Sequence, residues 1–159
     1  MSKSLTRRFE EAVFRHLRLD FPVGHPIWCP ARYVLVGGGW RAGKSVCGAA
    51  KHLKEALTNP KARLYWLLGP DYEQTKEEFR YLLEWCTGLN LLHPKIRPSI
   101  PNEGSRSLTL RTGCEIMTKS ARYPEKLGSV APDGIVVCEA GQVPYEVFRM
   151  CVGRVGEKR

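Results

Sequence analysis

A glycine-rich segment in the first third of the chain contains residue types that together bind phosphate. It fits the pattern G-x-x-x-x-G-K-S/T and consists of Gly38, Gly39, Trp40, Arg41, Ala42, Gly43, Lys44 and Ser45. Glycines let successive backbone N–H groups turn toward one anion, and a following helix would direct its N-terminal N–H groups to the same place. We therefore expect Lys44 to reach the β- and γ-phosphates of ATP and the Ser45 hydroxyl to ligate Mg²⁺.

The flanks of this segment predict the elements that would position it. Residues 33–36 (Tyr-Val-Leu-Val) favour a strand, and apolar residues recur at helical spacing over 46–57. A strand, a glycine loop and a helix in this order are the setting of a phosphate loop. One alternative stays open, because residues 37–42 also fit the looser dinucleotide pattern G-x-G-x-x-G/A and Glu55 lies near its acidic position. That pattern leaves residues 43–45 unexplained.

A second apolar segment ends in an acid of the kind that ATP hydrolysis requires. Residues 135–138 (Ile-Val-Val-Cys) lead into Glu139. At such a strand end a carboxylate orders Mg²⁺ through water, and a neighbouring Glu often activates the attacking water. Where Asp-Glu is expected the chain has Cys138-Glu139, and a thiol is a poor partner for Mg²⁺. Either Glu139 activates water and the metal-side acid is missing, or Glu139 takes the metal role beside Ser45.

The remaining patterns predict an α/β fold with a mainly parallel sheet. Apolar runs at 64–68 and 134–138 are typical of buried parallel strands. The helix after the glycine loop should stop at Asn59-Pro60, because proline cannot continue it. Further predicted elements are a lead-in helix over 4–18, a helix capped by Asp71 and closed by Gly88, a loop over 88–106 and a β-hairpin over 107–119.

Composition favours an acidic partner and a reducing compartment. The 159 residues carry a formal net charge of +9. Residues 95–126 hold seven Lys or Arg against three Glu, either a DNA-facing surface or a solvated hairpin face. None of the six cysteines forms a C-x-x-C pair, which argues against a zinc site or a disulfide framework. No apolar run approaches the roughly 20 residues that span a bilayer. We expect a cytoplasmic protein without a membrane partner.

Taken in order, these motifs resemble those of the N-terminal ATPase domain of a tailed-phage terminase large subunit, the DNA-packaging motor. The resemblance covers about residues 33–143. Its motifs are the phosphate loop, Gly69–Gln74, the hairpin, the segment from Ser120 to Gly128, and Val137–Ala140.

The resemblance implies an additional-strand P-loop fold with a hairpin insertion, and hydrolysis of ATP with Mg²⁺. It also implies double-stranded DNA as substrate, a homo-oligomeric ring at the portal protein of an empty capsid, and a small terminase subunit as partner. The expected place of action is the host cytoplasm. By the same resemblance Lys44 and Ser45 take the phosphate and Mg²⁺ roles, Glu139 is the catalytic glutamate, and Arg41 matches an arginine that many members carry in the loop.

Three departures from the family pattern qualify this expectation. Cys138 replaces the usual Asp, and Leu127 stands where an arginine often reaches a neighbouring subunit's ATP, with Arg122 and Lys126 as nearby substitutes. The coupling motif and the nuclease domain are absent from the sequence. We expect a lead-in over 1–32 and a partial ATPase domain over 33–159, incomplete at its C-terminus. The alternatives are a module that binds nucleotide or DNA without turnover, and another DNA-dependent P-loop motor such as a helicase.

Overall fold

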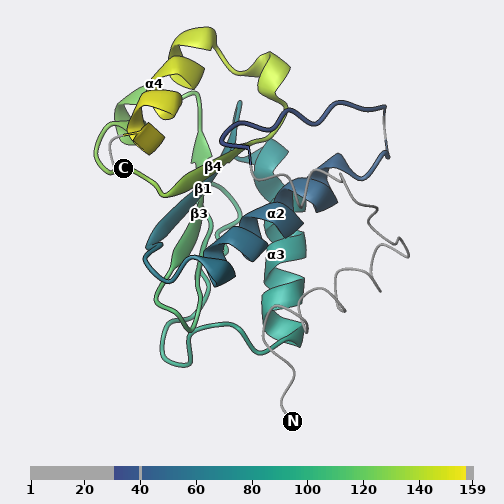
Figure 1. The fold of residues 1–159 in the computed structure, drawn as a ribbon, viewed down its shortest axis with the longest axis vertical. Coiled ribbons are helices and arrows are strands. Elements are labelled where there is room, and N and C mark those ends of the chain that lie inside the picture. Colours follow the sequence, from purple (N-terminus) through teal and green to yellow (C-terminus); the bar gives the residue numbers. More distant parts are fainter. Residues whose placement is uncertain (1–30, 40, 157–159) are drawn as a thin grey trace.

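A four-stranded sheet with β1 in its interior organises the chain (Figure 1). The computed structural model describes residues 31–39 and 41–156. The strand order is β2 (Ser107–Thr109), β3 (Glu115–Ser120), β1 (Leu64–Gly69) and β4 (Gly134–Val137). β1 pairs in parallel with both β3 and β4, and β2 pairs antiparallel with β3. The expected α/β class with a mainly parallel sheet is confirmed.

The described part of the chain also contains three helices and three short 3-10 turns. The helices are α2 (Lys44–Thr58), α3 (Lys76–Gly88) and α4 (Tyr145–Gly156), and the turns are η2 (Glu73–Thr75), η3 (Pro124–Leu127) and η4 (Ala140–Gln142). α2 ends before Asn59-Pro60, as predicted. The predicted Asp71 cap of the following helix does not form, because α3 begins after Thr75 without a side-chain cap; the Asp71 carboxylate instead accepts a hydrogen bond from the Glu73 N–H at 2.8 Å, before α3.

Apolar side chains cover both faces of the sheet, and they bury β1 on both sides. On one face Tyr65 and Leu67 pack with α2 and α3. On the other face Leu64, Trp66 and Leu68 pack with Val143, Val147 and Cys151 of the α4 region. Figure 1 shows the resulting layers, with α2 and α3 on one side of the sheet and α4 near its upper end. This two-sided burial explains the continuous apolar run of β1.

One predicted element is absent from the structure, and one helix was not predicted. The predicted strands at 64–68 and 134–138 are confirmed, and the predicted hairpin forms from β2 and β3, with β3 also extending the parallel sheet. The predicted strand at 33–36 is wrong, because these residues pair with no described strand. The expected helix over 4–18 lies outside the described residues. α4 has no counterpart among the sequence predictions.

Candidate nucleotide-binding site

The ends of the parallel strands bring the predicted site residues to one edge of the sheet. The strand register pairs Leu68 with Val137, so β1 and β4 end side by side. α2 lies against β4 so closely that a Cβ on Gly48 would come within 3.2 Å of Val136 Cγ1. Lys44 lies one helical turn before Gly48, which puts the start of α2 at the same edge as the end of β4. Ligands of open parallel sheets bind at this edge.

The phosphate-loop segment folds into a tight turn that its own lysine closes. Arg41 and Gly43 have positive φ of 60° and 78°. The Lys44 Nζ donates hydrogen bonds to the carbonyl oxygens of Gly38 and Gly39, both at 2.9 Å. An ammonium has three donors, so these two bonds hold Lys44 over the loop and leave a third donor for a phosphate oxygen. Trp40 lies outside the described residues.

The N-terminus of α2 is open to an anion. No side chain in the described part of the chain caps it, and its first turn contains no acidic residue. The first N–H groups of a helix lack partners within the helix and carry the positive end of its dipole. A 15-residue helix that leaves these donors uncapped beside a lysine is suited to phosphate. Ser45, in the first turn, is half-buried.

Cys138 and Glu139 follow β4 but face different surroundings. Cys138 is buried, and its backbone N–H donates to the Leu68 carbonyl oxygen at 2.7 Å. Burial raises the pKa of the Cys138 thiol far above its usual range, and the negative charges of Glu78 and Glu139 raise it further. The thiol is therefore neutral at physiological pH and cannot act as a thiolate ligand. Glu139 is exposed, with its backbone in the left-handed region at φ 50°.

Sequence analysis missed a buried acid at this edge, Glu78. It lies in the first turn of α3, on the same helical face as Thr75, Phe79 and Leu82, and is 7% exposed. It lies close enough to Cys138 to raise the pKa of that thiol. Its Oε2 is buried without a hydrogen-bond partner in the described structure. The detectable sign in the sequence was a charged residue in phase with the apolar face of the helix.

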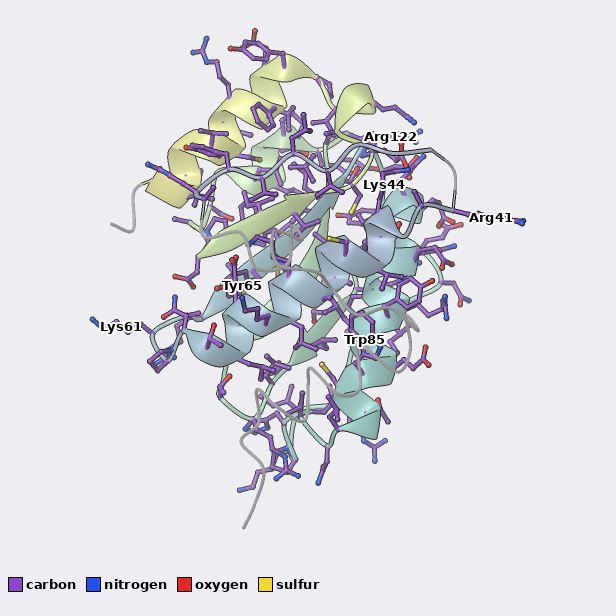
Figure 2. The ribbon with its side chains drawn as sticks, turned by 45° about the vertical axis from the view of Figure 1, so that its right-hand side comes forward. Arg41, Lys44, Lys61, Tyr65, Trp85 and Arg122 are labelled. Atoms are coloured by element: carbon purple, nitrogen blue, oxygen red, sulfur yellow. The ribbon has the colours of Figure 1, made fainter. Side chains whose placement is uncertain are left out.

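Two arginines of the candidate site differ in placement. The Arg122 guanidinium, after β3, pairs with the Asp71 carboxylate, after β1, at 3.4 Å. Figure 2 shows Arg122 and Lys44 at the same end of the molecule, while Lys61 lies at the far end of α2. Arg41 points outward from the body of the protein (Figure 2). Arg122 therefore lies at the same end of the molecule as Lys44, and Arg41 needs a side-chain rotation to reach a phosphate.

The basic region over 95–126 does not form one surface. Lys95 and Arg97 belong to the loop joined to the hairpin through the Ser99–Ser107 bridge, before β3, whereas Arg122 and Lys126 follow β3. The six residues of β3 extend for about 20 Å at the usual rise per residue. Arg106 is buried and donates to the Tyr72 carbonyl oxygen, so its role is structural. The positive charge therefore divides between the two ends of β3.

The oxygen atoms at this edge suit Mg²⁺ better than a metal ion whose ligands must all come from the protein. Among the described residues no group of three or more His, Cys, Asp or Glu could hold a metal ion. Mg²⁺ keeps several waters and binds through one or two carboxylates together with substrate phosphates. The Ser45 hydroxyl and the carboxylates of Glu139 and Glu78 supply such hard oxygen atoms, and the orphaned Oε2 of Glu78 is a ligand atom without another use.

The strand order and flanking helices define an α/β protein with a mainly parallel sheet. The chain is similar to the ATPase domain of the Thermus phage P74-26 large terminase, with 19% sequence identity and a TM-score of 0.59, covering 76% of this chain and 53% of that one. An arginine-to-alanine mutant of the same domain gives 18% identity and a TM-score of 0.55, covering 74% and 52%. The chain thus has the fold of a phage terminase ATPase domain and spans about half the length of these structures.

Sequence comparison adds nothing to this similarity of fold. No protein-family model and no curated protein matches the chain. Within the described residues, no helix has the length and apolar character needed to cross a membrane.

Proposed function

We propose that this chain is the ATPase module of a viral DNA-packaging terminase, which binds Mg²⁺–ATP at residues 38–45 and couples its hydrolysis to translocation of double-stranded DNA into a capsid. The uncapped N-terminus of α2, closed over by Lys44, carries the proposal. The similarity of the fold to a phage terminase ATPase domain supports it. The partners we propose are a ring of identical subunits, a portal protein and a small terminase subunit, in the host cytoplasm.

In this proposal each site residue has one task. The backbone N–H groups of the loop and of α2, with the Lys44 ammonium, bind the phosphate oxygens. Ser45 and a carboxylate hold the magnesium ion, which when bound supplies positive charge to the phosphates. Glu139 accepts the proton of the attacking water, because its carboxylate is exposed at the end of β4. Arg41 rotates inward to the phosphates, a movement that exposed side chains make within nanoseconds.

The positive charge at the two ends of β3 provides two possible contacts with the DNA backbone. Phosphate contacts are salt-dependent and independent of sequence, as packaging of a whole genome requires. Lys95, Arg97 and Arg111 are exposed at the end away from the phosphate loop. We propose that DNA contacts this distant end, because Arg122 pairs with Asp71 beside the nucleotide site.

Nucleotide binding is tested by calorimetry with Lys44→Ala and a matched control, Lys61→Ala. Both variants remove an ammonium, and Lys61 is exposed at the opposite end of α2 (Figure 2). A hydrogen bond to a charged group contributes about 1.5–3 kcal/mol, so Lys44→Ala should weaken Mg²⁺–ATP binding by about 10- to 150-fold. Lys61→Ala should bind like wild type. Equal affinity of all three folded proteins, or no binding by wild type, would remove ATP from this site.

A second candidate function is nucleotide or DNA binding without turnover. Cys138 favours it, because a buried neutral thiol stands where a carboxylate would orient the metal. The two candidates are separated by phosphate release with double-stranded DNA present. Release that depends on Lys44 supports the motor, whereas tight Mg²⁺–ATP binding without release supports the binding module.

A further inference from the structure

We propose that Glu78 of α3 supplies the carboxylate for the nucleotide's magnesium ion that Cys138 does not provide. This inference rests on the proposed Mg²⁺–ATP site and names a residue for it that lies outside both sequence motifs. The acid would approach the ion from the first turn of α3 instead of from the end of β4.

The first support is position. α3 follows the end of β1 after the short turn η2, and β4 ends beside β1. Glu78 therefore lies at the same sheet edge as Cys138, close enough to raise the pKa of its thiol. A carboxylate beside position 138 could therefore act where the expected Asp would.

The second support is the cost of leaving Glu78 as it stands. The residue is 7% exposed and its Oε2 has no hydrogen-bond partner among the described residues. A buried carboxylate without full pairing is destabilising, so such a group persists where it has another use. The positive end of the α3 dipole offsets part of this cost and supplies no donor to Oε2. A magnesium ion with its bound water would supply both charge and donors.

The third support is the chemistry of position 138. A thiol is a weak hydrogen-bond donor and a poor ligand for a hard cation such as Mg²⁺. A Cys at this position is thus compatible with a carboxylate beside it, whereas an Asp would place a second negative charge against Glu78. Cys138 and the buried Glu78 fit one arrangement. The site keeps a single metal-side acid, and that acid lies on α3 instead of at the end of β4.

The test separates metal-dependent from metal-independent nucleotide binding. Calorimetry measures the affinity for ATP with Mg²⁺ and with EDTA, for wild type, Glu78→Gln and the control Glu77→Gln. Glu77 is the neighbouring acid of the same helical turn, largely exposed and paired with Arg80 on the surface, where an ion pair contributes little. Loss of a group that orients a metal typically weakens metal affinity 10- to 100-fold. The Mg²⁺-dependent gain is the increase in ATP affinity from EDTA to Mg²⁺. Glu78→Gln should reduce this gain 10- to 100-fold and leave the affinity in EDTA unchanged, and Glu77→Gln should leave both unchanged.

Thermal unfolding of the nucleotide-free proteins supplies the second readout. Glu78→Gln removes an unpaired buried charge, so its Tm should equal or exceed that of wild type. A lower Tm with an unchanged Mg²⁺-dependent gain would show that Glu78 is structural and would overturn the inference. If Glu78→Gln does not fold, Glu78→Asp keeps the charge and shortens the side chain, and an unchanged gain in that variant would likewise overturn it.

The outcomes distinguish this inference from the proposed function. If wild type binds no ATP under either condition, the proposed site fails and this inference fails with it. If wild type binds ATP and gains affinity from Mg²⁺, but Glu78→Gln gains as much, only the role of Glu78 is refuted. Restoring an acid with Cys138→Asp in the Glu78→Gln protein should recover the gain to within a few-fold of wild type, and no recovery counts against the equivalence of the two positions.

Discussion

Replacing Cys138 by Asp should make the metal-free protein less stable as pH rises. Position 138 is 5% exposed, and the negative charge of Glu78 acts on the side chain there. Two negative charges about 4 Å apart repel by about 4 kcal/mol at an effective dielectric constant of 20. The new carboxylate avoids this repulsion by keeping its proton, because burial and neighbouring negative charge raise a pKa here, as they do for the thiol.

The pH dependence follows from the direction of that shift. A carboxyl whose pKa is raised on folding binds more protons in the folded state, so its contribution to stability falls as pH rises above the unfolded value of about 3.9. Each pH unit costs about 1.4 kcal/mol until the folded pKa is reached. Relative to wild type, Cys138→Asp should lose about 1–2 kcal/mol at pH 5 and about 3–4 kcal/mol at pH 8, the upper limit being the repulsion itself.

Urea unfolding followed by circular dichroism measures this difference, at both pH values and with EDTA or millimolar Mg²⁺. Cys138→Ser, which is uncharged at both pH values, controls for the change in packing. We expect Mg²⁺ to recover much of the loss at pH 8, because a divalent cation between two carboxylates removes their repulsion. An equal loss at pH 5 and pH 8 would refute the argument, because it would mean that the new carboxylate does not experience Glu78.

Two further predictions concern single residues. Glu139→Asn should abolish ATP turnover and keep Mg²⁺–ATP affinity within a few-fold. It should also raise stability by up to about 1 kcal/mol, because Asn tolerates the left-handed backbone at φ 50° better than Glu. Retained phosphate release would disprove the assignment of Glu139 as the base. His52→Phe should flatten the fall in stability between pH 6.5 and 4.5. Burial lowers the pKa of His52 to about 3, so the imidazole takes up a proton on unfolding, which favours unfolding by up to about 3 kcal/mol at the lower pH. Urea unfolding at both pH values checks this prediction, and an unchanged slope of stability against pH would contradict it.

The sequence predicted the elements whose pattern is local. α2 begins at the glycine loop and ends before Pro60 because both boundaries are set by the conformations of single residues. β1 was visible as a run of five apolar residues because both of its faces are buried. These features depend on no distant partner, and so a single sequence contains them.

The failed strand at 33–36 shows what such patterns leave out. Val34 and Val36 are half-buried while Tyr33 and Leu35 are exposed, so the alternation expected of a strand is present. A strand is defined by hydrogen bonds to a neighbour, however, and none of the described strands pairs with this segment. Apolar alternation reports burial of side chains, and pairing of the backbone is a separate, non-local condition. Glu78 was missed for a related reason, because its proximity to Cys138 involves segments 60 residues apart in the sequence.

Backbone strain supports the candidate site independently of any motif. Among the described residues, three other than glycine have positive φ: Arg41, Asn90 and Glu139. Asn adopts this conformation readily, but for Arg and Glu it costs roughly 1–2 kcal/mol each. Such residues cluster at functional sites, where the surrounding structure holds them. Arg41 and Glu139 are nearly one hundred residues apart, yet both belong to the segments singled out for chemistry, and neither pattern contains information about φ. That coincidence is the strongest reason to test Glu139 and the loop together.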